Sequence, residues 1–117
     1  MNVNQKGTIG LIKVIDDLYH QGLQCYLPFD DYSPVDLIAI DKNGFTYRIQ
    51  VKYKSSDTTL ATRSIVNGQP IQIDRSLLDG WAVYLAEHDK VIYIPIEFMK
   101  DRKTHRVAHN FDYGSIW

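Results

Sequence analysis

The stretch VDLIAIDKNGFTYRIQVKYK, residues 35–54, holds two apolar runs separated by the turn Lys42-Asn43-Gly44. β-Branched and aromatic residues on both sides of an Asn-Gly pair are a strong local signal for a β-hairpin. Three polar residues interrupt these runs: Asp36 near the start of the first, and Gln50 and Lys52 in the second. Because side chains alternate along a strand, Gln50 and Lys52 share one face. Polar groups are costly to bury unless they are paired or bind a metal, so the pattern predicts a functional cluster.

The length of 117 residues predicts one domain, residues 1–117, with the apolar content of an ordinary globular protein. The apolar runs are strand-sized, and the first residues lack the apolar core of a signal peptide, so we expect no membrane association. The single cysteine, Cys25, can form no internal disulfide and has no zinc-binding spacing. We therefore expect a reduced, buried cysteine in a cytoplasmic protein.

The formal net charge is −1, which argues against a nucleic-acid partner, but the charges are unevenly distributed. Residues 44–75 contain five basic and two acidic residues, and residues 100–117 contain four basic and two acidic ones. The rest of the chain is acidic on balance. Such segregation predicts either a one-sided basic surface for an anionic partner or two solvated faces without a partner.

Apolar periodicity predicts a helix over residues 5–21, ended by Gly22 in a left-handed conformation. Two nearly continuous apolar runs, 81–86 and 91–96, predict strands in the interior of a sheet, covered on both faces. The other expected elements are a strand at 23–27, a loop at 55–59, a second hairpin or excursion at 62–66 and 70–74, a helical turn at 76–80 and a short helix at 97–100. This order predicts an α/β (α+β) fold with the first helix packed on the sheet.

Pro34 and Asp36, followed after thirteen residues by Gln50 and Lys52 and preceded by a helix, resemble the PD-(D/E)XK nuclease superfamily. The chain is similar in particular to small intron-associated homing endonucleases of cyanobacteria and their phages, a branch that accepts Gln where most members have Asp or Glu. The similarity covers roughly residues 5–99 and includes the later segments GWAVY and YIPI. The resemblance implies a restriction-endonuclease-like core with a mixed central sheet, acting on DNA in a bacterial or phage-infected bacterial cell.

The resemblance also implies roles for the hairpin residues. Asp36, Gln50 and the carbonyl of Val51 would bind Mg²⁺, which prefers oxygen ligands and for which Mn²⁺ can substitute. Lys52 would stabilise developing negative charge or help to deprotonate a metal-bound water. Two structural alternatives stay open: an ion pair between Asp36 and Lys52, or Gln50 and Lys52 as exposed positions on an edge strand.

The first helix departs from the family pattern at one position. Many relatives carry a Glu after a Gly on this helix, where it completes the metal site, but here Gly10 precedes Leu11. Leu11 is then either a core residue beside a weak metal site or a replacement that inactivates the protein. With Asp36 as the only carboxylate of the motif, we expect weak metal affinity.

DNA recognition is expected from the basic segments. In the excursion, residues 58–75, donor-rich side chains suit base edges in the major groove, namely Arg63, Gln69, Gln72 and Arg75. Others suit phosphates, namely Lys54, Ser55, Arg102 and Lys103. A domain this small covers few base pairs, so recognition of a long site predicts a homodimer or homotetramer. The aromatic tail, residues 104–117, is the expected oligomerisation segment.

The sequence thus favours a Mg²⁺-dependent, sequence-specific endonuclease of the homing type that cuts double-stranded DNA. A DNA-binding module on the same scaffold with weak or no cleavage is the alternative. Within the enzyme class, a junction resolvase or a restriction-type nuclease is a further alternative, because such enzymes recognise structure or short palindromes.

Overall fold

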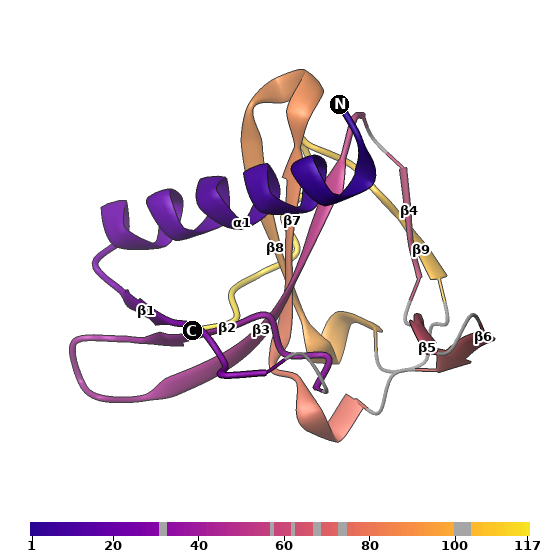
Figure 1. The fold of residues 1–117 in the computed structure, drawn as a ribbon. Coiled ribbons are helices and arrows are strands. Elements are labelled where there is room, and N and C mark those ends of the chain that lie inside the picture. The colour runs from indigo at the N-terminus through magenta and orange to yellow at the C-terminus, as the bar shows by residue number, and fades with distance from the viewer. Residues whose placement is uncertain (31–32, 57, 62, 67–68, 73–74, 100–103) are drawn as a thin grey trace.

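The computed structural model describes residues 1–117 except 31–32, 57, 62, 67–68, 73–74 and 100–103. One long helix, α1 (Val3–His20), lies across one face of a five-stranded sheet (Figure 1). In spatial order the strands are β1 (Gln24–Tyr26), β2 (Leu37–Ile40), β3 (Thr46–Lys54), β7 (Gly80–Leu85) and β8 (Lys90–Pro95). β3 and β7 are parallel and the other neighbours are antiparallel. The predicted fold, a helix packed on a mixed sheet, is confirmed.

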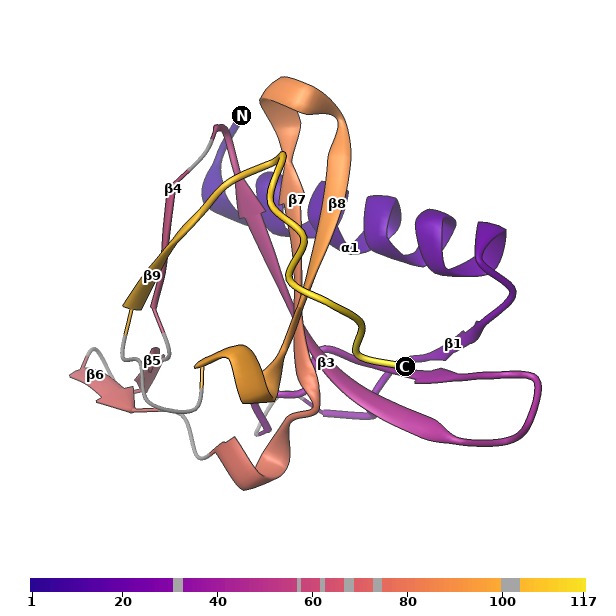
Figure 2. The same ribbon diagram turned by 180° about the vertical axis from the view of Figure 1, so that it is seen from behind.

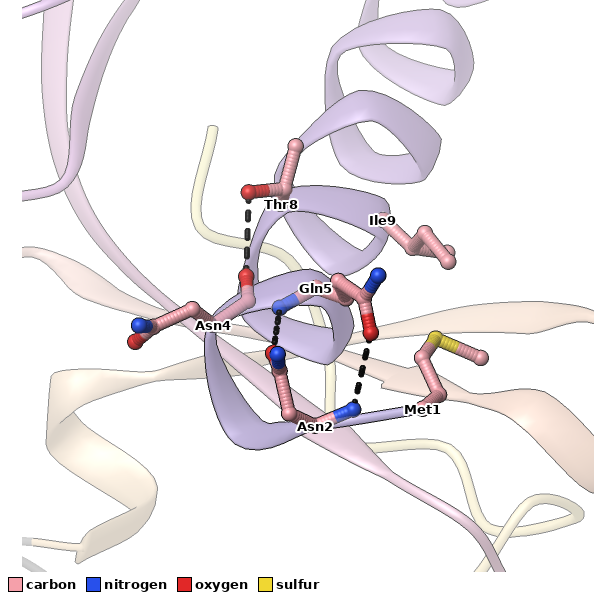
Figure 3. Close-up of a pocket in the computed structure, with 6 residues that line it drawn as sticks. All are labelled: Met1, Asn2, Asn4, Gln5, Thr8 and Ile9. Atoms are coloured by element: carbon pink, nitrogen blue, oxygen red, sulfur yellow. Dashed lines mark hydrogen bonds between the residues drawn. The ribbon is translucent and has the colours of Figure 1, made fainter.

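Helix α1 begins at a capping box. The Asn2 side chain accepts a hydrogen bond from the Gln5 backbone N–H, and the Gln5 side chain accepts one from the Asn2 N–H, both at 2.9 Å (Figure 3). This reciprocal pair satisfies two backbone donors that a helix start leaves free, so the helix begins two residues earlier than predicted. At the other end Gly22 has φ +89°, which confirms the predicted left-handed stop.

The predicted hairpin is formed by β2 and β3, with Leu37 opposite Ile49 and Ile40 opposite Thr46. The Asp41 carboxylate closes its turn by accepting the backbone N–H groups of Asn43 and Phe45 at 2.9 and 3.1 Å. Gly44 adopts φ +87°, a conformation that most other residues avoid. Local turn chemistry thus sets the register between β2, which Asp36 directly precedes, and β3, which carries Gln50.

Two small sheets lie beside the main one (Figure 1). β5 (Arg63–Val66) pairs with β6 (Gln69–Gln72), which confirms the second antiparallel pair predicted for this region. β4 (Thr58–Ala61) pairs with β9 (Thr104–Val107). The predicted loop over 55–59 is therefore wrong for residues 58 and 59, which belong to β4. Short 3₁₀ helices complete the described part of the chain, namely η1 (Arg75–Leu77), η2 (Ala86–His88) and η3 (Ile96–Met99).

The prediction of two interior strands holds for β7, which is buried throughout, but not for β8, which is an edge strand of the described sheet. The C-terminal segment crosses β7 and β8 on the face of the sheet opposite α1 (Figure 2). Lys90 Nζ donates to the His109 carbonyl at 2.6 Å, and the rings of Tyr93 and Trp117 lie 4.8 Å apart, edge to face. The tail therefore packs on residues of β8, although it adds no strand beside it in the described sheet.

The sheet has a hydrophobic cluster on each face. Residues of α1, including Val14 and Leu18, pack with Ile49 on one face, and Trp81 and Ile94 pack with the tail residue Tyr113 on the other. Cys25 is half-buried at the rim of the first cluster rather than fully buried as predicted. In the part of the chain that the structure describes, no helix is long and apolar enough to cross a membrane.

Candidate active site

β3 changes its partner at Ile49. Residues up to Ile49 pair with β2, whereas residues from Ile49 to Lys54 pair with β7. Beyond Ile49, the edge of β3 that faces away from β7 has no strand partner in the described sheets. Asp36, which directly precedes β2, lies on this open edge. Its backbone N–H donates to the Ile49 carbonyl at 2.9 Å, and its carboxylate accepts the Val51 N–H at 2.8 Å. The Asp36 carboxylate thus occupies the place of a strand partner beside Val51.

The backbone of Val51 presents a second oxygen at this edge. The N–H and C=O of one strand residue point to the same side, and the Val51 N–H points to Asp36. The Val51 carbonyl is therefore directed to the open edge, as the predicted metal-ligand role requires.

A pocket of about 660 Å³ lies between this edge and the first half of α1. It is lined by Asp36, Val51 and Tyr53 and by the helix residues Val3, Asn4, Gly7, Thr8 and Leu11. Gly10 lets the helix approach closely, since a Cβ there would lie 3.3 Å from the Tyr53 Cβ. The structure therefore brings three predicted site positions, Leu11, Asp36 and Val51, to one cavity.

Gln50 lies on the opposite face of β3 from Val51 and Tyr53. Its side chain is only 6% exposed, and its Oε1 accepts a hydrogen bond from Trp81 Nε1 at 3.0 Å. Because Gln50 is buried and Lys52 is half-buried, they are not two exposed positions, and that alternative is wrong. The Gln50 oxygen already has one partner, Trp81, which residue spacing in the sequence does not reveal.

Lys52 is half-buried on the same face as Gln50. Burial lowers its pKa, and the neighbouring charge of Lys54 lowers it further, against the opposing effect of Asp36. Burial likewise raises the pKa of Asp36, although the Val51 N–H and the charge of Lys52 both lower it. No ion pair joins Asp36 to Lys52 among the described residues, so the structural ion pair considered above is not formed. Each charge is therefore left partly uncompensated, as expected where a ligand binds.

The oxygen atoms that the pocket offers as metal ligands suit a hard divalent cation, but they are few. The Asp36 carboxylate and the Val51 carbonyl are ligand types that Mg²⁺ accepts. Among the described residues, those of this pocket included, no three His, Cys, Asp or Glu side chains are grouped to hold a metal. Leu11 places an apolar group at the cavity wall where a second carboxylate would strengthen binding. The residues present fit a weakly held cation.

The residues predicted to contact DNA are only partly placed. Lys54 ends β3, and Ser55 follows it with its side chain exposed and its carbonyl accepting the Glu87 N–H at 2.8 Å. Arg63 lies opposite Gln72 in the β5–β6 pair, and Gln69 lies opposite Val66. Arg75 begins η1, and both Arg102 and Lys103 lie outside the described residues.

Arg48, counted in the basic segment, has a structural role instead. Its guanidinium contacts the Asp79 carboxylate at 3.2 and 3.3 Å and the Ser76 carbonyl at 3.0 Å. Its backbone N–H also donates to Asp79 at 2.7 Å. This pairing could not be found from spacing, because Asp79 reaches Arg48 only through the parallel register of β3 and β7.

Comparisons with known proteins agree with this architecture. A family model described as PD-(D/E)XK endonuclease matches residues 1–110. The solved structure of I-Ssp6803I, a bacterial homing endonuclease, superposes with a TM-score of 0.76 over 94% of this chain and 80% of that chain. The two sequences are 16% identical, so this likeness concerns the fold alone. No curated protein sequence matches the chain.

Proposed function

The chain belongs to the PD-(D/E)XK endonuclease family, and we propose that it is a metal-dependent, sequence-specific homing-type endonuclease that hydrolyses phosphodiester bonds in double-stranded DNA. The observation that carries this proposal is the position of Asp36. Its carboxylate lies on the open edge of β3, in a cavity under α1, and it lacks a cationic partner within ion-pair distance among the described residues.

We propose that Asp36 and the Val51 carbonyl hold a divalent cation, Mg²⁺ or Mn²⁺ in its place. The Gln50 oxygen has a second lone pair besides the one that Trp81 uses, so it can add a neutral ligand or orient the attacking water. The cation would supply Lewis-acid polarisation of the phosphate and a more acidic water.

The role proposed for Lys52 follows from its surroundings. Lys52 is half-buried, so its interaction with a phosphate is less screened than that of a fully exposed lysine. Because burial lowers the pKa of Lys52, its neutral form is also more accessible than that of an ordinary lysine. The side chain can therefore either stabilise the charge that develops on the phosphate or accept a proton from the attacking water.

We propose that DNA lies along the side of the molecule where β3 ends, with Lys54 and Ser55 next to phosphates. β5 and β6 form a two-stranded ribbon, an element that the major groove can admit. A long target would require a homodimer or homotetramer. The tail remains a candidate interface only in part, because Val107 and Tyr113 are buried in their own chain while Phe111 is exposed.

A second candidate function, DNA binding with little or no cleavage, is favoured by one observation. Leu11 lines the Asp36 cavity and contributes no oxygen ligand to it. A site with a single carboxylate holds a divalent cation weakly, so the protein could occupy its target without cutting it.

Cleavage of a plasmid library of random inserts, with Mg²⁺ or Mn²⁺ and sequencing of captured ends, tests both candidates. Four proteins are compared: the natural chain, Leu11→Glu, Leu11→Glu with Asp36→Asn, and Leu11→Glu with Lys52→Ala. The matched control is Ile12→Glu, which adds the same carboxylate one residue further along the helix, at an exposed position outside the cavity.

We expect Leu11→Glu to cut at least as fast as the natural chain, and Ile12→Glu not to gain activity. Asp36→Asn and Lys52→Ala should each abolish cutting while duplex binding persists. If neither the natural chain nor Leu11→Glu cuts, although both bind duplex DNA tightly, the binding module is the correct function. If Lys52→Ala cuts normally, the site assignment is wrong even though the activity stands.

A further inference from the structure

Gln50 and Trp81 lie side by side on the adjacent parallel strands β3 and β7. They are directly opposite each other in the register of this pair (Figure 1). Trp81 is completely buried, Gln50 is 6% exposed, and Trp81 Nε1 donates a hydrogen bond to Gln50 Oε1 at 3.0 Å. The indole N–H is a donor only, so it can pair with the oxygen of the amide but not with its nitrogen. Trp81 therefore fixes which end of the Gln50 amide faces the core.

The nitrogen end of the Gln50 amide is left for another partner. In the described structure, Gln50 Nε2 donates to no residue. Every buried side-chain nitrogen and oxygen among the described residues has a hydrogen-bond partner, so Nε2 must keep some contact with solvent. The small exposed part of Gln50 thus includes its NH₂ group, which carries two donors. A nearly buried amide with unused donors is an arrangement that an acceptor on a ligand would complete.

Lys52 adds a second donor on the same face of β3. Side chains two residues apart on a strand point the same way, about 6.6 Å apart along the strand. Lys52 is half-buried, and its ammonium forms no hydrogen bond or ion pair within the described residues. Asp36 and the Val51 carbonyl, the ligands proposed for the cation, lie at the adjoining open edge. Donors on the face and a cation at the edge together suit an anion with several oxygens, such as a phosphate diester.

On the basis of the proposed nuclease function, we propose that Gln50 acts through its amide nitrogen, as a hydrogen-bond donor to a non-bridging oxygen of the phosphate that is cut. Trp81 is the positioning residue that sets this orientation. A cation ligand would have to be the amide oxygen, which Trp81 holds on the buried side. The donated hydrogen bond stabilises the negative charge that grows on the phosphate oxygens during hydrolysis.

A purely structural role is the alternative, in which Gln50 only satisfies the Trp81 N–H in the core. Gln50→Glu separates the two roles, because a carboxylate still accepts the Trp81 N–H but has no donor to offer. The change also separates a phosphate contact from a cation ligand. A carboxylate strengthens a cation site but repels a phosphate.

Binding measurements test the proposal without requiring cutting. The probe is a duplex that the natural chain selects from a pool of random sequences in the presence of Ca²⁺, which accepts the same kinds of oxygen ligand as Mg²⁺. The duplex dissociation constant of Gln50→Glu should rise about 10-fold or more, because a charge-assisted hydrogen bond is lost and repulsion replaces it. Its Mg²⁺ affinity without DNA, measured by calorimetry, should change by less than about threefold.

Trp81→Phe removes the group that orients the amide. The amide can then turn its oxygen outward, so the duplex dissociation constant should rise about threefold. In the Gln50→Glu background the same change should have no effect, because a carboxylate presents an oxygen in either orientation. A purely structural tryptophan would weaken binding equally in both backgrounds. The matched control is Trp117→Phe, at the edge-to-face contact with Tyr93, which should leave duplex binding unchanged.

Nuclear magnetic resonance of the natural chain needs no variant, so it decides the question even if Gln50→Glu fails to fold. The Gln50 Nε2 protons are assigned through the backbone of Gln50. At least one of them should move downfield when the duplex binds in Ca²⁺, since a phosphate oxygen is a stronger acceptor than water. The indole N–H of Trp81 should keep its position, because its acceptor is unchanged.

Three results would overturn the role of Gln50 while leaving the nuclease function in place. Tight duplex binding by Gln50→Glu would show that no donor is needed at this position. A Mg²⁺ affinity raised about 10-fold or more in Gln50→Glu would identify residue 50 as a cation ligand instead. Unchanged Gln50 NH₂ signals on duplex binding would make Gln50 a structural partner of Trp81 alone. If the natural chain selects no duplex, the proposed function fails and this role fails with it.

Discussion

Two aspartates close opposite edges of β3 in the same way, and they differ in what surrounds them. Asp79 donates its N–H to the Arg48 carbonyl at 2.8 Å and accepts the Arg48 N–H at 2.7 Å. Asp36 donates to the Ile49 carbonyl and accepts the Val51 N–H at nearly the same distances, 2.9 and 2.8 Å. Each therefore replaces a missing strand neighbour, one on the β7 side and one on the β2 side.

The difference lies in the compensating charge. Burial raises the pKa of Asp79, but the hydrogen bonds and charge of Arg48 outweigh burial and hold it below its usual range. At Asp36 burial prevails, because Lys52 makes no ion pair with it in the described structure and its charge only partly offsets the effect. One carboxylate is satisfied within the chain and the other is left for a ligand. The first should therefore matter for stability and the second for activity.

The largest effect is expected at the residue where β3 changes partner. Ile49 is fully buried between α1 and the sheet. Replacing it by Ala should lower the free energy of unfolding by about 3 kcal/mol, since a cavity remains where two strand pairings meet. Urea unfolding followed by tryptophan fluorescence measures this loss. Phe45→Ala, at an exposed position, should change stability by less than about 0.5 kcal/mol, and an equal loss there would contradict the argument.

The next effect is expected at the satisfied aspartate. Asp79→Asn should cost about 1 kcal/mol at pH 7, a value kept small because the Arg48 and Asp79 side chains are 42% and 34% exposed and solvent screens the pair. The folded-state pKa of Asp79 is lowered, so its contribution is present above the unfolded-state value of 3.8 and is lost as the pH falls below it.

Urea unfolding at several pH values checks this sign. The stability difference between the natural chain and Asp79→Asn should shrink between pH 5 and pH 2.5. A difference that stays constant over this range would show that the Asp79 charge has no part in stability. An Arg48→Met protein, which keeps the apolar stem, should lose most of the same pH dependence.

A comparable or smaller effect is expected at Gln50, which belongs to the half of β3 that carries Asp36. Gln50→Leu should cost about 1 kcal/mol, because it leaves the buried Trp81 N–H without its acceptor. A double-mutant cycle with Trp81→Phe measures the coupling in urea unfolding. If the double variant loses as much as the two single variants together, the hydrogen bond does not stabilise the fold.

Whether a contact in this protein can be predicted from the sequence depends on how far apart its two residues lie in the chain. The α1 cap, the Gly22 stop and the Asp41 turn are local, and the β2–β3 hairpin that depends on that turn could be predicted. The β4–β9 pair could not, because its strands are far apart in the sequence and each is too short for a periodic signal. The Gln50–Trp81 hydrogen bond could not be predicted for the same reason, because it depends on the register of the parallel strands β3 and β7.

The side of α1 that meets the sheet could not be predicted for a different physical reason. Periodicity identifies the apolar residues of a helix but not which of them meet the sheet, so the exposed Ile12 and Tyr19 cannot be distinguished from the buried Val14 and Leu18. Around the site, spacing could place Asp36 beside Val51 through the hairpin register. It could not show that Gln50 faces Trp81 while Leu11 faces Asp36, because the helix and β7 come from outside the hairpin.

The smallest effect on stability is expected at Asp36, where the effect on activity should be largest. Asp36→Asn keeps an oxygen that can accept the Val51 N–H and removes a charge that burial disfavours. Stability in the absence of metal should therefore change by less than about 0.5 kcal/mol, in contrast to Asp79→Asn. Cleavage and metal-dependent protection against unfolding should both be lost. If Asp36→Asn instead destabilised the chain as much as Asp79→Asn does, both aspartates would be structural residues that complete the edges of β3. The contrast between a stabilising and a ligand-binding aspartate would then be wrong.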